Sequence, residues 1–473
     1  MPITAIDVSP QVKKILPWIV AIAFFMQSLD ATILNIALPS MARDLNVNPL
    51  NMESAVIAYM LTVAMIIPMC GWVSDRFGTR KIFFASVALF SLGSVICAVS
   101  WTLPVLIFGR VIQGLGGALM MPVGRLVILR VYPRDEFLKV MSFVTVPGLL
   151  GPLMGPTLGG WLVEYFSWHW IFLINVPMGV LGCFVALKFM PDLRSAIVSK
   201  FDVFGFLLFA SAMLLISLGL EGLSDFHLKP IMIVVLFVVG ISCFVGYWIH
   251  AFRSEHPLFP PTVFCVRSFS LGLVGNLFAR LGNGSLPFLI PLLLQLALGY
   301  SPANAGMMMI PLAISAIVAK SVVQYLIRFF GYRLILTSNT LLLGMLICNF
   351  MLVTKDTSFI VLITLLGLMG AINSIQFTAM NTVTLFELED EQASSGNALL
   401  AVIVQLSISF GISFSAILLV YFNGERPTSA SIDILPAFQA TCFTVGLFTV
   451  FSSLIFYFLP KYIGKEYKKK IHH

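Results

Sequence analysis

The sequence predicts an all-α membrane protein: two six-helix bundles and two accessory transmembrane helices, fourteen spans in all, with both termini in the cytoplasm. Three observations lead to this fold class. Of the 473 residues, 59% are hydrophobic and 10% are charged, whereas a soluble domain has roughly 25% charged residues. The mean hydropathy is +0.99. Apolar runs long enough to cross a bilayer recur along the whole chain, so the chain is expected in a membrane.

Each predicted span is an apolar run of about 20 residues, the length that crosses the hydrocarbon core of a bilayer. The runs fall at 15–39, 53–73, 82–101, 103–128, 138–162, 169–190, 203–222, 229–250, 268–294, 302–323, 333–353, 357–383, 395–421 and 436–460. Charged stretches flank the two middle runs. The chain therefore divides into a first bundle at 1–190, an accessory two-helix insert with its flanking loops at 191–267, a second bundle at 268–460 and a basic tail at 461–473.

Lysine and arginine are unequally distributed between the two sides of the predicted membrane. Of 28 such residues, 19 lie in the termini and in the loops on the same side, and four lie in the opposite loops. Cytoplasmic loops are rich in these residues, so both termini are expected in the cytoplasm. The loop from Glu387 to Glu391, with four acids and no base, departs from the trend, and its role stays open.

Several function classes have no support in the sequence. The net charge of +7 is explained by the cytoplasmic loops, so we expect no nucleic-acid partner. The seven cysteines have no zinc-site spacing, and no phosphate-binding loop or H-E-x-x-H motif is present. No serine, histidine and acid can be nominated as a catalytic set. We therefore expect no enzymatic activity, no metal and no cofactor.

A few charges lie where the end of a span cannot explain them. Asp30 is the only acid well inside a predicted span, and Arg110, Arg280 and Lys320 are the bases in this position. A charge in mid-membrane costs at least about 2.5–3.5 kcal/mol, so it usually faces a pathway or a partner. Asp30 and Arg110 lie about 13 Å and about 10 Å below the outer ends of their helices, so they can pair. The pair either exchanges a proton during transport or ties two helices together permanently.

Amide side chains accompany these charges at helical spacing. Gln27 lies one turn before Asp30, and Gln113 lies one turn after Arg110. Such groups either line a polar cavity or bond one helix to another. The candidate substrate-binding residues are Gln27, Asn35, Gln113, Arg280, Asn283, Asn373 and Gln376.

Two further patterns concern the organisation of the bundles. The segment 75–80 is similar to 328–333: Gly78 matches Gly331 and Arg80 matches Arg333, while Arg328 replaces an acid. Two similar halves are typical of secondary transporters. In the fifth span, glycines recur at every fourth residue from Gly151, and interspersed prolines are expected to bend the helix. This span is either a sliding interface or a simple packing seam.

Five segments together resemble the signature motifs of the Major Facilitator Superfamily, over nearly the whole chain. They lie at 29–39, 71–81, 110–117, 147–160 and 168–177. The chain is most similar to the 14-span drug:proton antiporter branch (EmrB/QacA-like), and within it to the HsrA/MdtD group of efflux proteins. The fifth segment has His169 where arginine is common.

The resemblance implies alternating access driven by protons, with Asp30 and Arg110 as the proton-coupling residues. It also implies a set of residues that control the conformational change. These are Gly71, Asp75, Arg76, Gly78, Arg80, Gly151, Pro152, Gly155 and Pro156. The first five lie in the segment 71–81, which joins spans two and three, and the others lie in the fifth span.

We therefore expect a monomeric exporter of small amphipathic molecules, drugs or metabolites, in the bacterial inner membrane, with the lipid bilayer and protons as its other partners. The alternatives are an exporter of an anionic metabolite or siderophore-like chelate, a proton-coupled importer, and a membrane sensor or channel. Three deep bases against one deep acid favour a neutral, zwitterionic or anionic substrate. The substrate itself and the proton stoichiometry do not follow from the sequence.

Overall fold

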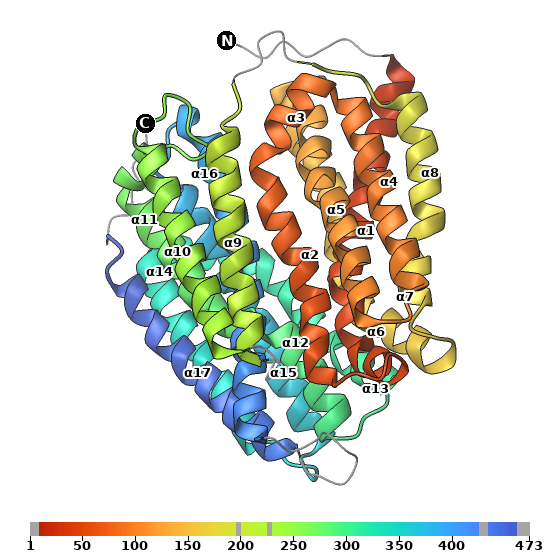
Figure 1. The fold of residues 1–473 in the computed structure, drawn as a ribbon, viewed down its shortest axis with the longest axis vertical. Coiled ribbons are helices and arrows are strands. Elements are labelled where there is room, and N and C mark those ends of the chain that lie inside the picture. The colour runs from red at the N-terminus through yellow and green to blue at the C-terminus, as the bar shows by residue number, and fades with distance from the viewer. Residues whose placement is uncertain (1–8, 195–199, 225–228, 425–433, 461–473) are drawn as a thin grey trace. The chain divides into compact units, whose positions relative to one another are not determined.

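The computed structural model describes residues 9–194, 200–224, 229–424 and 434–460, and every regular element in these ranges is a helix (Figure 1). The contacts divide the chain into two compact units, Met1–Val203 and Phe204–His473. The first unit contains α1 (Pro10–Asp44), η1 (Pro49–Met52), α2 (Glu53–Ile66), η2 (Ile67–Met69), α3 (Cys70–Phe77), α4 (Thr79–Ala98), α5 (Leu103–Val131), α6 (Arg134–Tyr165), α7 (Trp170–Leu173) and α8 (Asn175–Phe189).

The second unit contains the remaining elements. They are α9 (Val203–Ser224), α10 (Pro230–Ala251), η3 (Pro261–Cys265), α11 (Arg267–Asn283), α12 (Leu286–Leu292), η4 (Leu293–Ala297), α13 (Pro302–Met308), α14 (Ile310–Asn349), η5 (Phe350–Leu352), α15 (Phe359–Leu385), α16 (Asp390–Asn423) and α17 (Leu435–Tyr457). The element η4 is a π-helical turn. The accessory helices α9 and α10 group with this unit, and their status as a separate insert stays a prediction.

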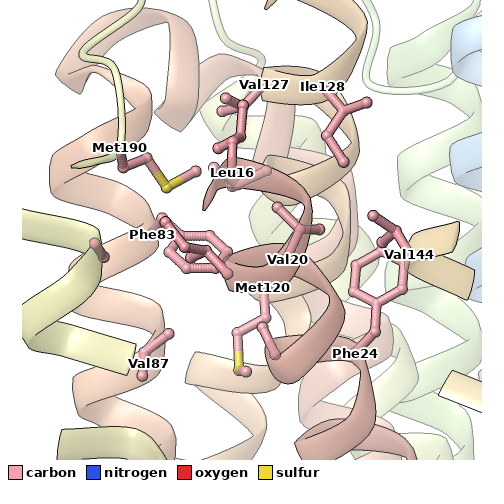
Figure 2. Close-up of a cluster of buried hydrophobic side chains, with 14 of the residues drawn as sticks. Leu16, Val20, Phe24, Phe83, Val87, Met120, Val127, Ile128, Val144 and Met190 are labelled. Atoms are coloured by element: carbon pink, nitrogen blue, oxygen red, sulfur yellow. The ribbon is translucent and has the colours of Figure 1, made fainter. Parts of the chain in front are cut away.

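Helix α1 is the central element of the first unit. It packs along α6 and also contacts α5 and α8, while α4 packs on α5 and α8. One half of α1 enters an apolar core to which Leu16, Val20 and Phe24 contribute, with Phe83 of α4 and Met120 of α5 (Figure 2). Because lipid tails are as apolar as these side chains, the core is stabilised mainly by close van der Waals packing.

The contact of α1 with α6 depends on glycine. A Cβ atom on Gly151 would lie 2.7 Å from the backbone nitrogen of Leu29, and one on Gly155 would lie 2.2 Å from Oγ1 of Thr32. The Thr32 hydroxyl lies 3.3 Å from the Gly151 carbonyl oxygen and donates to it. The glycines of the fifth predicted span thus form a packing seam within the first unit, and their role in conformational change stays a prediction.

The second unit repeats the packing of the first. Helix α11 contacts α15, α16 and α17, as α1 contacts α5, α6 and α8, and α14 packs on α15 and α17 as α4 packs on α5 and α8. Gly78 (φ 92°, ψ 143°) and Gly331 (φ 77°, ψ 161°) both turn the chain between the second and third spans of their halves. Side chains rarely tolerate this conformation, which explains glycine at both positions.

The described residues contain 13 helices long and apolar enough to cross a membrane, against the fourteen spans predicted. The difference lies in one candidate, Pro302–Leu352, which has 51 residues. At 1.5 Å per residue it would extend about 75 Å, more than two bilayer thicknesses. Gly331 interrupts its helical geometry, so it contains both spans predicted at 302–323 and 333–353. The basic tail at 461–473 lies outside the described residues.

Candidate functional site

The buried ion pair expected from helix depth is present in the first unit. Arg110 Nη1 on α5 lies 2.7 Å from Asp30 Oδ2 on α1, and each side chain is 1% exposed. The two residues are 80 positions apart in the sequence. Two ionised groups removed from water in this way stabilise each other only when further hydrogen bonds satisfy them.

Neutral amides satisfy the rest of the carboxylate. The side-chain nitrogens of Gln113 (2.6 Å) and Asn175 (3.1 Å) both donate to Asp30 Oδ1. Gln113 Oε1 in turn accepts a hydrogen bond of 2.7 Å from Arg110 Nη1. Ser94 Oγ accepts from Gln113 at 3.0 Å and from Asn175 at 3.4 Å. The carboxylate is therefore enclosed in this conformation, so proton exchange requires this network to open.

The guanidinium of Arg110 also joins α2 to the network. Its Nε donates to the carbonyl oxygen of Ala55 at 3.2 Å, and its Cζ lies 4.4 Å from the centre of the Tyr59 ring. Both contacts compensate a buried cation, the first through a hydrogen bond and the second through the ring quadrupole. Arg110 on α5 thus contacts both α1 and α2.

The other two polar residues predicted on α1 do not bind this pair. Gln27 is half-buried, and its Oε1 accepts no hydrogen bond from a described residue. Asn35 is 5% exposed and donates to the Ala31 carbonyl of its own helix at 3.4 Å. Sequence reasoning nominated these two and missed Asn175 and Ser94. The available signal was an amide within an otherwise apolar segment, at the start of the sixth span.

In the second unit, Arg280 is surrounded by neutral groups. Its side chain is 3% exposed, and its Nε donates to Asn276 Oδ1 at 3.0 Å. Its Nη2 donates to Asn381 Oδ1 at 3.3 Å, and its Cζ lies 4.4 Å from the centre of the Phe377 ring. The charge of Arg280, predicted to lie inside a span, is therefore buried. Its partners come from α11 and α15 and carry no charge.

The other candidate amides of this unit form two separate contacts. Asn283 donates to Asn373 Oδ1 at 2.7 Å and so connects α11 to α15. Gln376 instead faces α14: it accepts from Asn339 at 3.0 Å and donates to the Thr340 hydroxyl at 2.5 Å. Helical spacing placed Asn373 and Gln376 on one side of α15, but their partners lie on different helices.

Helices α3 and α5 share one partly exposed ion pair. Arg130 Nη2, at the end of α5, lies 2.6 Å from Asp75 Oδ1. Arg76 packs against the Trp72 ring, with 5.4 Å between Cζ and the ring centre, and Arg80 Nε donates to the Met190 carbonyl at 2.5 Å. Within the first unit, the partner of Asp75 is therefore Arg130, which sequence reasoning did not nominate.

The first residue of α4 is hydrogen-bonded to the segment that follows α8. The Thr79 backbone nitrogen donates to the Leu193 carbonyl at 3.1 Å, and the Leu193 nitrogen donates to the Thr79 hydroxyl at 3.0 Å. Gly71, by contrast, has nothing within 4 Å of the position of a Cβ atom. The positive φ of Gly78 therefore explains glycine at that position, whereas packing within the first unit places no demand on Gly71.

Two helical units with matching internal contacts and buried polar networks define a multi-pass membrane protein with a duplicated fold. The sequence model of the Major Facilitator Superfamily matches residues 20–256 and 272–472. The chain belongs to this superfamily.

It is 45% identical over 446 residues to a protein of Pectobacterium atrosepticum that is named as a multidrug resistance protein, MdtD, with 94% of each chain covered. An MdtD of Serratia proteamaculans is 44% identical over 443 residues, which cover 94% of this chain and 93% of that one.

Solved structures share the fold at low identity. A POT family transporter in complex with 5-aminolevulinic acid matches with a TM-score of 0.70 and 15% identity, covering 96% of this chain and 97% of that one. A D-xylose-proton symporter matches with a TM-score of 0.67 and 14% identity, covering 95% and 98%. Family membership and the membrane-spanning helices together identify a multi-pass protein of the bacterial inner membrane.

Proposed function

We propose that this protein is a proton-coupled antiporter that exports small amphipathic molecules by alternating access. The observation that carries the proposal is the Asp30–Arg110 pair, in which a carboxylate and a guanidinium, each 1% exposed, lie 2.7 Å apart. Relatives named for multidrug resistance favour export over the importer, sensor and channel alternatives. The protein is expected to act as a monomer.

In the proposed cycle, a proton from the outside neutralises Asp30. Loss of that negative charge removes the main attraction that holds Arg110 against α1, because a charge-assisted hydrogen bond is about twice as strong as a neutral one. Gln113 can then replace the carboxylate as the acceptor for the guanidinium, since its Oε1 already lies 2.7 Å from Nη1. Release of the proton to the cytoplasm restores the pair and returns the transporter to its starting state.

Efflux from proteoliposomes tests this proposal. The transported compound is first selected by a binding screen of acids, cations and neutral lipophiles on the purified protein. Its efflux is then followed with and without an imposed pH gradient, for the wild type and for Asp30→Asn. We expect the pH gradient to accelerate efflux only when Asp30 is present.

The matched control is Asp44→Asn, which changes an exposed acid at the end of the same helix. In the wild type, the Trp168 indole nitrogen donates to the Asp44 carboxylate at 2.7 Å, and the asparagine keeps an oxygen acceptor for it. This variant should retain pH-driven efflux. Equal stimulation by the gradient in Asp30→Asn and the wild type would remove Asp30 from the mechanism and leave the pair with a purely structural role.

A further inference from the structure

Arg280 is a buried cation without an acidic partner. In the ranges that the structure describes, the ion pairs within 4.0 Å involve Arg110, Arg130 and Arg194, and none involves Arg280. Its side chain is nevertheless 97% buried, since only 3% is exposed. A buried charge is normally paired, because neutral dipoles only partly replace the water that it has lost. Arg110, which is 1% exposed, is paired with the carboxylate of Asp30.

The guanidinium of Arg280 keeps unused hydrogen-bond donors. Of its five N–H groups, one at Nε donates to Asn276 and one at Nη2 donates to Asn381. Nη1 donates to no described residue. Three N–H groups therefore remain, two on Nη1 and one on Nη2. One of the Nη1 groups faces the edge between Nη1 and Nη2, which is open to a carboxylate oxygen.

The surroundings hold this edge in place. Asn276 donates to the Gly272 carbonyl at 2.9 Å and to the Thr384 hydroxyl at 3.2 Å, so its Oδ1 is fixed toward Arg280. The Phe377 ring covers one face of the guanidinium, and 43% of the Phe377 side chain is exposed. An apolar surface thus lies directly beside the unused donors. This combination suits a ligand that has both an anionic group and an apolar body.

The membrane span is kinked next to this site. Helix α11 ends at Asn283 and α12 begins at Leu286, although the two residues between them keep helical backbone angles. Pro287 has no N–H and cannot donate to the Asn283 carbonyl four residues earlier, which explains the kink. The kink lies one turn from Arg280, near the middle of the candidate span Arg267–Ala297. It leaves a backbone carbonyl without its usual helical donor beside the guanidinium.

We propose that Arg280 binds the carboxylate of an amphipathic organic acid, with Asn276 and Asn381 orienting the guanidinium and Phe377 contacting the apolar part of the ligand. This inference rests on the proposed transport function and specifies its substrate class. It places one substrate contact wholly within the second unit. The expected ligands are carboxylates rather than organic cations.

Ligand-dependent thermal stability of the purified protein in detergent tests the proposal without requiring transport. The probes are benzoate, its neutral isostere benzamide and the cation benzylammonium. A ligand that binds only the folded state raises the melting temperature with its concentration. We expect benzoate to raise it in a saturable manner, and we expect benzamide and benzylammonium to have little effect. Equal shifts with benzoate and benzamide would overturn the proposal.

Two variants then locate the binding site. Arg280→Gln should abolish the benzoate shift. Asn381→Asp should also abolish it, because it places a carboxylate where the Asn381 amide now accepts from Arg280. The same variant should raise the melting temperature measured without ligand. Arg125→Gln, which removes an exposed arginine from α5, should keep the shift. A benzoate shift that persists in both Arg280→Gln and Asn381→Asp would refute the site. If the wild-type protein binds benzoate but shows no proton-driven efflux, the proposed function is refuted and the binding site is not.

Discussion

The Asn175 amide donates to Asp30 Oδ1 at 3.1 Å, although the two residues are 145 positions apart in the sequence. This contact connects the first residue of α8 to the middle of α1. Because Asn175 is fully buried, its amide can satisfy the carboxylate without admitting water. It is therefore a positioning residue for the ion pair.

Replacement of Asn175 by alanine tests that role. Hydrogen bonds to charged groups contribute about 1.5–3 kcal/mol, so Asn175→Ala should lower the free energy of unfolding by a similar amount. The donor also orients the carboxylate, so its loss should change how efflux depends on pH. Thermal unfolding and efflux at a series of pH values measure the two effects. A lowered stability with an unchanged pH profile would restrict Asn175 to a structural role.

The charged pair at this site could be predicted from the sequence, whereas its neutral partners could not. The depths of Asp30 and Arg110 follow from helix geometry, because a charge in an apolar run stands out and its rise along the helix is fixed. Asn175 and Ser94 carry no charge, and only the packing of α4 and α8 brings them to Asp30. Likewise, the backbone match of Gly78 and Gly331 could be predicted from a local motif, whereas the partner of Asp75 depends on tertiary structure.

A double variant separates the two interpretations of the ion pair. Asp30→Asn or Arg110→Gln alone should destabilise the protein, because removal of one partner from a buried pair costs about 3–5 kcal/mol. The double variant has no uncompensated charge and should recover part of that loss. Proton coupling predicts that it still lacks pH-driven efflux. A stable double variant with normal pH-driven efflux would identify the pair as a permanent tie between α1 and α5.

The glycine seam between α1 and α6 predicts a sharp difference between two alanine variants. A Cβ atom on Gly151 would lie 2.7 Å from backbone atoms of α1, so Gly151→Ala should cost about 1–3 kcal/mol through overpacking. Gly71→Ala, within the helix α3, meets nothing within 4 Å and should instead stabilise the protein by about 0.5–1 kcal/mol. Unfolding curves of the two variants make the comparison. Unchanged transport by Gly71→Ala would also contradict the gating role assigned to Gly71 by resemblance.

The backbone at Gly331 predicts strain even where there is space. Its φ of 77° and ψ of 161° lie in a region that is essentially restricted to glycine, although a Cβ atom there would contact nothing within 4 Å. Gly331→Ala should therefore lower the free energy of unfolding by about 1–3 kcal/mol. Gly367 in α15 is the matched control, because a Cβ atom there would make an ordinary 3.9 Å contact with Pro311.

Gly367→Ala should instead stabilise the protein by about 0.5–1 kcal/mol, since alanine loses less conformational entropy than glycine in a helix. The two substitutions add the same methyl group and are predicted to have opposite signs. Thermal unfolding of both variants measures the difference. Gly78 has a similar conformation, with φ of 92°, so Gly78→Ala should also destabilise the protein. A neutral effect at both Gly78 and Gly331 would contradict the proposed reason for the repeated glycine.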